Sequence, residues 1–357
     1  MLHKLLATTN FFKLLAIITS LLLSLLPLTV FAQNKTLNIY IWANEIPPFV
    51  IQAFQKETGI KVNVATFENN EMLYAKLRTT KQSGYDIIMP SGYFVDRMRK
   101  QNMLEKLDIS KLTKWKNINP VFLHPSYDPL SEYSVPHMWG VTGMFVNQRY
   151  FPANSITKWS DLWQSRFDNQ LLMLDDTREV FAIALLSLGY SVNDRDPVHI
   201  KEAFLKLKSL MKNIKVFSSD TIISIMIDED ATAGMSWNGE TYKAMQENPN
   251  VHFIFPTDGF VIWVDNFCIP KNALHKDAAY MFINYILRAE IGKEIALATK
   301  SSITNLAAQK ILPPEIRDNP VIYPSEEVLK HGQFQVDVGD ETTALYEKYW
   351  EELKMGG

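Results

Sequence analysis

Acidic and aromatic side chains recur where the strand-like segments of this 357-residue chain end. No lysine, arginine or histidine is among them. Carboxylates form charge-assisted hydrogen bonds to ammonium groups, and aromatic faces attract cations by about 0.5–2 kcal/mol each. An anionic ligand would instead require basic residues or free helix N-termini. The set therefore predicts a ligand with several ammonium groups on an alkyl chain; its members are Trp42, Ser91, Tyr93, Asp176, Glu179, Trp237, Trp263 and Asp265.

Asp265 is the most informative single residue of this set. It interrupts the apolar residues of segment 261–269, which otherwise predict a buried strand. A carboxylate in a buried strand costs several kcal/mol unless it is paired. Asp265 therefore predicts a polar partner or a cationic ligand.

The other members also have ordinary structural interpretations. Asp176 and Glu179 have the spacing of a helix N-cap and its third helical residue, ahead of an apolar run. Ser91 has the position of an N-cap for a helix from Phe94, and the tryptophans are of a type that is usually packed in a core. Spacing alone leaves both interpretations open.

The elements that must position these residues form two alternating sets, which indicates an α/β fold with two lobes. The first is a β-α-β-α-β succession, typical of a parallel sheet covered on both faces, whose loops at the carboxyl ends of the strands form the usual ligand site. Its strands are 37–42, 60–67 and 85–89, and its helices stop at Gly59 and Gly84. The second set has strands 141–146, 171–174 and 260–269 and helices 160–163, 178–188 and 276–299.

Composition predicts a globular chain of about two domains, with 47% hydrophobic and 21% charged residues.

Residues 1–32 predict a cleaved signal peptide, because Lys4 and Lys13 precede an apolar run that ends in Val-Phe-Ala. An uncleaved anchor is the alternative. Loss of the two lysines moves the formal charge from −3 to −5, which gives no nucleic-acid footprint. Cys268 is the single cysteine, so an intramolecular disulfide is impossible.

Several long stretches of the chain are distinctive: Phe54-Gln-Lys-Glu-Thr-Gly-Ile-Lys-Val, Tyr85-Asp-Ile-Ile-Met-Pro-Ser, Asp175-Asp-Thr-Arg-Glu-Val-Phe, Met235-Ser-Trp-Asn-Gly, Trp263-Val-Asp, Asn305-Leu-Ala-Ala and Gln335-Val-Asp-Val-Gly. Through these stretches the sequence closely resembles the spermidine/putrescine-binding proteins of bacterial ABC transporters, over essentially the whole mature chain.

The resemblance implies a two-lobed periplasmic-binding-protein fold of type II, with the ligand cleft between the lobes and hinge crossings near Gly140, Val264 and Gln309. Lobe 1 would comprise 33–140 plus 265–309, and lobe 2 would comprise 141–264 plus 310–357. Trp42, Tyr93, Trp237 and Trp263 would form aromatic walls, and Asp176, Glu179 and Asp265 would bind ammonium groups. Ser91, Ser219 and Gln335 would give polar contacts; Ser219 and Gln335 come from the resemblance alone.

The chain departs from the family's pattern after its first tryptophan. Trp-Thr-Glu-Tyr is replaced by Trp42-Ala-Asn-Glu45, and a late tyrosine corresponds to Ser301. These changes remove an aromatic wall and a donor, and they move a carboxylate by one position. We hypothesise that Glu45 still meets a terminal ammonium group, so that ligand length changes and the cationic class does not.

The expected function is capture of spermidine, putrescine or both in the periplasm and delivery to a membrane permease and its cytoplasmic ATPase. No cofactor, metal or nucleic acid is expected, and the protein should be a monomer. An enzyme is disfavoured because Asp176 and Glu179 lie three residues apart on one helix start and would not flank a bond. Binding of another small cation or a metal ion, for which the seven scattered histidines lack ligand spacing, and a sensor role remain alternatives.

Overall fold

The computed structural model of the chain describes residues 36–79 and 83–356. The predicted signal peptide, residues 1–32, and its cleavage site lie outside the described residues. No helix within the described ranges is both long and apolar enough to cross a membrane.

Three parallel strands form the first sheet, in the order β2-β1-β3. This confirms the predicted β-α-β-α-β succession. Helix α2 ends at Gly59, whose φ of 69° is the left-handed conformation that glycine adopts readily. The elements are β1 (Thr36–Trp42), α2 (Pro48–Thr58), β2 (Lys61–Phe67), α3 (Asn70–Thr79), β3 (Ile87–Ile88) and α4 (Gly92–Lys100).

Strand β3 is shorter than the predicted 85–89. Asp86 and Met89 on either side of it still donate their N–H groups to the carbonyls of Asn38 (2.7 Å) and Tyr40 (3.2 Å) on β1. Pro90 has no N–H group and cannot extend the ladder. The chain therefore leaves the sheet at the residues that lead into Ser91.

The second sheet has the order β11-β9-β4-β7-β5-β6, and β10 and β8 also pair with β4. Strand β4 is thirteen residues long and buried throughout, whereas the sequence predicted only 141–146. Its first half contains Pro136, His137 and Gly140, which break the apolar pattern on which that prediction depended. The strands are β4 (Val135–Asn147), β5 (Leu171–Met173), β6 (Ile214–Phe217), β7 (Ala233–Trp237), β8 (Val251–Ile254), β9 (Phe260–Phe267), β10 (Ser302–Ile303) and β11 (Gly332–Phe334).

Helices cover both sheets. They are α5 (Thr177–Ser187), α6 (Pro197–Leu210), α7 (Ile222–Ile227), α8 (Asn238–Glu247), α9 (Lys276–Ile286), α10 (Ala289–Thr299), α11 (Leu306–Gln309), α12 (Pro314–Arg317), α13 (Glu326–Leu329) and α14 (Asp340–Met355). Short 3₁₀ turns lie at Ile109–Lys111, Trp115–Asn117, Pro120–Phe122, Ala153–Ser155, Trp159–Trp163, Ser165–Phe167 and Met211–Asn213. The predicted helix 160–163 is one of these turns.

The predicted helical stretch 276–299 is wrong in one respect, because two helices, α9 and α10, occupy it. Arg288 between them has an extended backbone, with φ −63° and ψ 141°. Its guanidinium binds both carboxylate oxygens of Glu57 on α2, at 2.9 and 2.6 Å. No proline or glycine marks the break, so the sequence alone gave no sign of it.

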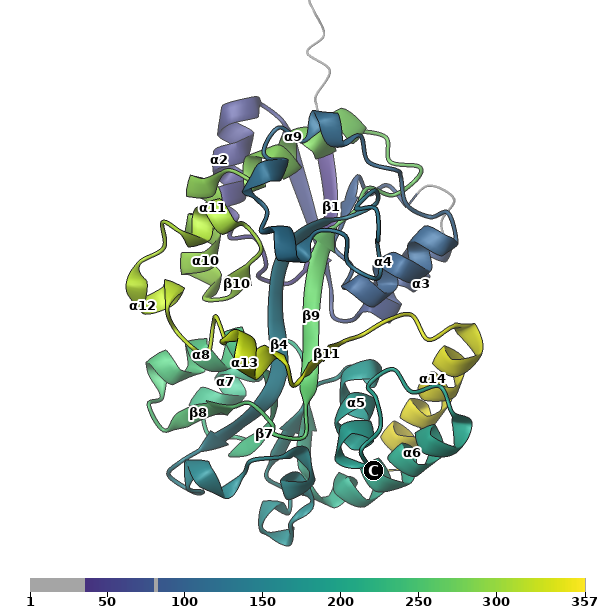
Figure 1. The fold of residues 1–357 in the computed structure, drawn as a ribbon, viewed down its shortest axis with the longest axis vertical. Helices are drawn as coiled ribbons and strands as arrows, with labels where there is room; N and C mark the ends of the chain where they lie inside the picture. The colour runs from purple at the N-terminus through teal and green to yellow at the C-terminus, as the bar shows by residue number, and fades with distance from the viewer. Residues whose placement is uncertain (1–35, 80–82, 357) are drawn as a thin grey trace, which may run out of the picture. The chain divides into compact units, whose positions relative to one another are not determined.

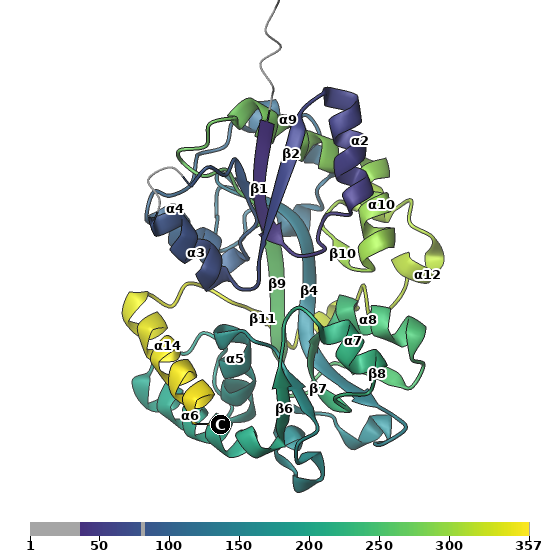
Figure 2. The ribbon, with the colours of Figure 1, turned by 180° about the vertical axis from the view of Figure 1, so that it is seen from behind.

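Strands β4 and β9 run antiparallel through two hydrophobic cores (Figure 1). At one end, Val135 and Phe267 belong to the core beneath α2, α9 and α10; at the other, Val146 and Val261 belong to the core beneath α5, α6 and α14. Figure 2 shows β1 and β2 at the first end and α7, α8 and β8 at the second. This strand pair therefore connects the two lobes.

Replacing Gly140 by alanine tests how tightly this strand pair is packed. An added Cβ would contact the Trp263 ring and lie 2.6 Å from Asn238 Oδ1. We expect Gly140→Ala to lower the free energy of unfolding by about 1–3 kcal/mol, the usual cost of overpacking, as measured by denaturant unfolding. Gly356→Ala is the control, because its Cβ would lie 3.3 Å from one carbonyl at the end of α14. Equal effects of the two substitutions would contradict this account.

Candidate functional site

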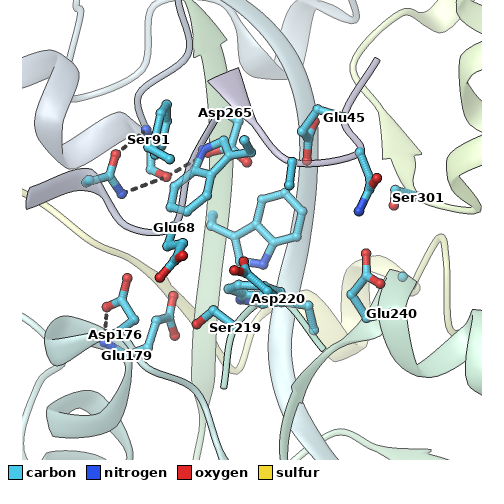
Figure 3. A pocket seen from close by; sticks show the side chains of 18 of the residues that line it. Glu45, Glu68, Ser91, Asp176, Glu179, Ser219, Asp220, Glu240, Asp265 and Ser301 are labelled. Atoms are coloured by element: carbon cyan, nitrogen blue, oxygen red, sulfur yellow. Dashed lines mark hydrogen bonds between the residues drawn. The ribbon is translucent and has the colours of Figure 1, made fainter. Parts of the chain in front are cut away.

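A cavity of about 920 Å³, counted with the solvent at its mouth, lies at the ends of strands from both sheets (Figure 3). All eleven residues predicted for the site line it. They are Trp42, Glu45, Ser91, Tyr93, Asp176, Glu179, Ser219, Trp237, Trp263, Asp265 and Gln335. The fold thus brings together residues that lie up to about 290 positions apart in the chain.

Aromatic rings form much of the wall. Trp42 at the end of β1 packs on Phe67 at the end of β2, with ring centroids 4.6 Å apart. Trp237 ends β7, and Trp263 lies within β9. Each tryptophan is half-buried. They therefore face the cavity and do not lie wholly in a core, which was the alternative interpretation.

Asp265 lies deep in the cavity on β9 and is buried. The Ser91 hydroxyl donates to its Oδ1 at 2.6 Å. Asn70 holds Ser91 in turn, because its Nδ2 donates to the Ser91 hydroxyl at 3.2 Å and its Oδ1 accepts from the Ser91 N–H at 3.0 Å. Burial raises the pKa of Asp265 to about 7, although the Ser91 hydrogen bond and the Trp42 indole lower it.

Ser91 occupies the N-cap position of α4, which begins at Gly92, two residues before the expected Phe94. Its side chain makes no capping hydrogen bond, because the hydroxyl is directed to Asp265. The predicted N-cap position is therefore confirmed, but Ser91 caps the helix with its backbone carbonyl, which accepts from the N–H groups of Phe94 and Val95 at 2.9 and 3.1 Å.

Asp176 and Glu179 lie at the start of α5, on the opposite side of the cavity from Glu45 and Ser301 (Figure 3). Asp176 Oδ1 accepts from the Glu179 N–H at 3.0 Å, so the predicted cap is confirmed. Glu179 is buried, and its Oε2 has no hydrogen-bond partner among the described residues. Burial and the charge of Asp176 raise the pKa of Glu179 to about 8.

Arg178 lies between these two acids in sequence but directs its guanidinium elsewhere. It donates to the carbonyls of Val336 and Val192 at 3.4 and 3.3 Å, and it lies over the rings of Tyr93 and Tyr346. Its charge lowers the pKa of Asp176, which burial nevertheless keeps raised. Arg178 thus lowers the pKa of Asp176 and of Glu179 without forming an ion pair with either acid.

Glu45 lies in the loop after β1 and is half-buried. Burial and the charge of Asp265 raise its pKa well above the usual range, and its Oε2 has no partner in the described part of the chain. Asn44 before it adopts a φ of 63°, a left-handed conformation that asparagine tolerates. This loop turns the carboxylate of Glu45 toward the cavity (Figure 3).

Ser219 and Gln335 contribute uncharged polar groups. The Ser219 hydroxyl accepts from the Asp175 N–H at 3.1 Å. Gln335 is buried, and its Nε2 finds no partner in the ranges 36–79 and 83–356. A buried amide without a partner is costly unless a ligand or water completes it.

Sequence reasoning missed several acidic and polar residues of the lining. Glu68 and Asn70 follow β2, so the rule that found Tyr93 would also have found them. Asp220 follows Ser219, and Glu240 lies in the first turn of α8. The charge of Asp220 raises the pKa of Glu68. Behind the lining, burial and the charge of Asp176 raise the pKa of Glu71 to about 8.

The lining is strongly acidic. Seven of its twenty residues are aspartate or glutamate, and none is lysine, arginine or histidine. Within the described ranges, Glu240 is the one member of the seven that has a basic side chain within ion-pair distance, namely Lys243. The cavity therefore holds negative charge that the described residues leave largely unpaired.

The histidines lie elsewhere. His137 is buried against Phe267, with ring centroids 4.5 Å apart, and burial lowers its pKa to about 3. His331 is exposed. Neither histidine lines the cavity, and the described residues contain no cluster of three or more potential metal ligands.

A family model for bacterial extracellular solute-binding proteins matches residues 50–323. The chain belongs to this family. It is 42% identical over 325 residues to the spermidine/putrescine-binding periplasmic protein of Salmonella typhimurium, which covers 91% of this chain and 93% of that protein. It is 32% identical over 346 residues to the putrescine-binding periplasmic protein SpuD of Pseudomonas aeruginosa, with coverage of 91% and 93%.

Solved structures of solute-binding proteins share the fold. The spermidine/putrescine ABC transporter substrate-binding protein PotD of Streptococcus pneumoniae matches with a TM-score of 0.76 and 34% identity, covering 90% of this chain and 99% of that one. The TpPotD lipoprotein of Treponema pallidum matches with a TM-score of 0.78 and 29% identity, covering 89% and 99%. The predicted two-lobed, type II solute-binding fold is confirmed.

The acids of this solute-binding protein should make its stability depend on pH. Glu179 and Asp265 have ordinary pKa values near 4, but in the folded state these rise to about 8 and about 7. Between these limits the folded state retains protons that the unfolded state has lost, so each group's contribution to stability falls as pH rises. Asp265→Asn should therefore make the unliganded protein more stable at pH 8 than the wild type, with a smaller gain at pH 5, in denaturant unfolding.

Asp86→Asn is the matched control for that measurement. Asp86 is also buried, but its carboxylate accepts from the N–H groups of Asn38, Leu274 and His275 at 2.9, 3.1 and 2.8 Å. This substitution should destabilise the protein at both pH values. A loss of stability in Asp265→Asn at pH 8 would show that Asp265 has a structural role like that of Asp86.

Proposed function

We propose that this solute-binding protein captures polyamines, with spermidine and putrescine as leading ligands, and delivers them to an ABC importer. The observation that carries the proposal is the set of buried carboxylates, Asp176, Glu179 and Asp265, for which the described residues supply no ion-pair partner. An ammonium group brings both the positive charge and the hydrogen-bond donors that such carboxylates need.

The rest of the lining suits the alkyl part of a polyamine. The half-buried rings of Trp42, Trp237 and Trp263 offer apolar faces to methylene groups and negative faces to ammonium groups. Nε2 of Gln335 has no partner at its present position. If the side-chain amide is turned by 180°, its oxygen takes that position and can accept a hydrogen bond from an ammonium group.

The relatives support the same ligand class, because the Salmonella and Pseudomonas proteins are named for spermidine or putrescine binding. Their periplasmic location supports export of this protein after cleavage of residues 1–32. Delivery would require a membrane permease and a cytoplasmic ATPase. We propose that the protein acts as a monomer without cofactors.

Binding would close the two lobes around the ligand. The proposed lobes comprise 33–140 plus 265–309, and 141–264 plus 310–357. Strands β4 and β9 pass between them, with Gly140 paired to Trp263 and Trp139 paired to Val264. Residues from both sides line the cavity, so a ligand would contact both lobes only when they are closed. Such differential contact is what shifts a conformational equilibrium.

Two alternatives use the same cavity. A sensor would bind polyamines with the same residues and differ only in its partners. Binding of a metal ion would require a tighter group of ligands. An enzymatic role is disfavoured because Asp176 and Glu179 lie on one helix start and point the same way, so they do not flank a bond.

Replacing Asp265 by asparagine tests the proposed function. We expect a loss of about 2–5 kcal/mol of polyamine affinity, the range for breaking a desolvated charge pair. Calorimetric titration of the mature protein with putrescine, cadaverine, norspermidine and spermidine measures it, with an amino acid and a sugar as ligand controls.

Asp108→Asn is the control variant, because Asp108 caps a surface turn outside the cavity. It should bind like the wild type. Failure of the wild type to bind any polyamine would refute the proposed function, and a loss below tenfold in Asp265→Asn for every polyamine would refute the role of Asp265.

Glu45→Gln tests the hypothesis that the changed loop after β1 still binds a terminal ammonium group. We expect this substitution to lower the affinity for spermidine more than the affinity for putrescine. The longer ligand is better able to reach Glu45 while it remains bound at Asp176 and Glu179. The same titrations measure both affinities. Unchanged affinity for every polyamine would contradict the proposed role of Glu45 in binding a terminal ammonium group.

A further inference from the structure

At the Glu45 end of the cavity, a lining acid is paired with a cation of the protein that does not itself line the cavity. Glu240 lies in the first turn of α8, and Lys243 one turn later places its Nζ 2.8 Å from Glu240 Oε1. The two side chains are only 26% and 20% exposed, so the pair is much less solvated than a surface ion pair. This separates Glu240 from the other acids of the lining, for which the described residues provide no such partner.

The positive charge of Lys243 acts beyond Glu240. It lowers the pKa of Glu45, which burial and the charges of Asp265 and Glu240 raise. Lys243 therefore lies close enough to influence both acids at this end. At the other end, the charge of Arg178 also acts on Asp176 and Glu179, but its guanidinium is held by backbone carbonyls away from them. At the Glu45 end, the Glu240 carboxylate is therefore already paired with an ammonium group of the protein, whereas at the other end neither Asp176 nor Glu179 is paired with a cation of the described residues.

The backbone around Glu240 keeps this arrangement compact. A Cβ on Gly239 would lie 2.6 Å from the Ser301 hydroxyl oxygen, so the start of α8 packs directly against the loop after α10. Tyr242, next to Lys243, is buried in the core beneath α2, α9 and α10. The start of α8, which belongs to the proposed second lobe, is thus packed against residues of the proposed first lobe.

We propose that Lys243 determines how many ammonium groups the cavity accepts, by occupying Glu240 from within the protein and leaving Glu45 as the free carboxylate at this end. This inference rests on the proposed function. A ligand ammonium that reached Glu240 would have to displace the Lys243 ammonium, exchanging one ion pair for another of the same kind. A polyamine with one further ammonium group therefore gains little binding free energy from it. The cavity favours the polyamine with fewer ammonium groups.

The test compares spermidine with spermine, which carries one more ammonium group, in calorimetric titrations of the mature protein at one pH and one salt concentration. Lys243→Met should raise the ratio of spermine affinity to spermidine affinity by roughly tenfold, the effect of one additional partly buried charge pair. Lys243→Gln, a polar replacement, should shift the ratio in the same direction.

The double variant Glu240→Gln/Lys243→Met should return the ratio to the wild-type value, because the carboxylate that Lys243 occupied is then gone as well. Lys106→Met is the matched control: Lys106 also forms an ion pair, 2.8 Å from Glu132, but neither residue lines the cavity. It changes the net charge by the same amount and should leave the ratio unchanged.

The outcomes separate the two proposals. If the wild type binds no polyamine, the proposed function is wrong. If it binds polyamines but Lys243→Met and Lys243→Gln leave the ratio unchanged, or alter it no more than Lys106→Met does, the role of Lys243 is wrong and the proposed function stands. A double variant that keeps the raised ratio would also overturn the inference, because Glu240 would then not be the carboxylate involved.

Discussion

Carboxylates buried together without cations are the constraint on which the rest of this structure depends. Each pays a desolvation penalty in its charged form, and the charges of Asp176 and Asp265 further raise the pKa values of Glu179 and Glu45. Asp265 and Glu179, with pKa values raised to about 7 and about 8, lie near the point of protonation at neutral pH. The unliganded cavity therefore has two ways to relieve its charge, a proton or a cation. A ligand with several ammonium groups replaces several protons at once.

The fold maintains this unfavourable group by fixing each acid to a different rigid element. Asp265 is part of β9, Asp176 and Glu179 begin α5, and Glu240 begins α8. Asn70 and Ser91 hold the Asp265 carboxylate from the first sheet. Residues of β9, α5 and α8 are packed into the same hydrophobic core, so within the closed arrangement the acids are held close together despite their repulsion. Hydrophobic packing supplies the free energy that keeps the site in place.

Much of this arrangement was predictable from the sequence, because strand ends and buried polar residues leave local signals. Asp265 was found because it interrupts an apolar run, and Asp176 and Glu179 because they follow the predicted strand 171–174; their cap spacing was the competing structural interpretation. The break at Arg288 was not found, since no proline or glycine marks it and the Arg288–Glu57 pair at that point joins residues more than 200 positions apart. Glu240 was also missed, because an acid in the first turn of a helix with a lysine three residues later is an ordinary surface pattern. Only the neighbouring Glu45 and Ser301 make that pair part of a cavity.

In the proposed mechanism, charge at the mouth of the cavity would link binding to closure. Glu68 follows β2 of the first sheet and Asp220 follows β6 of the second, and both are exposed. The charge of Asp220 nevertheless raises the pKa of Glu68, so the two carboxylates lie near one another across the opening. Bringing the two sides together without a cation increases this repulsion, while an ammonium group between them turns it into attraction. Because solvent screens exposed charges, this contribution is smaller than that of the buried acids and decreases with salt. The buried acids should therefore dominate affinity, while the acids at the mouth bias closure toward the loaded state.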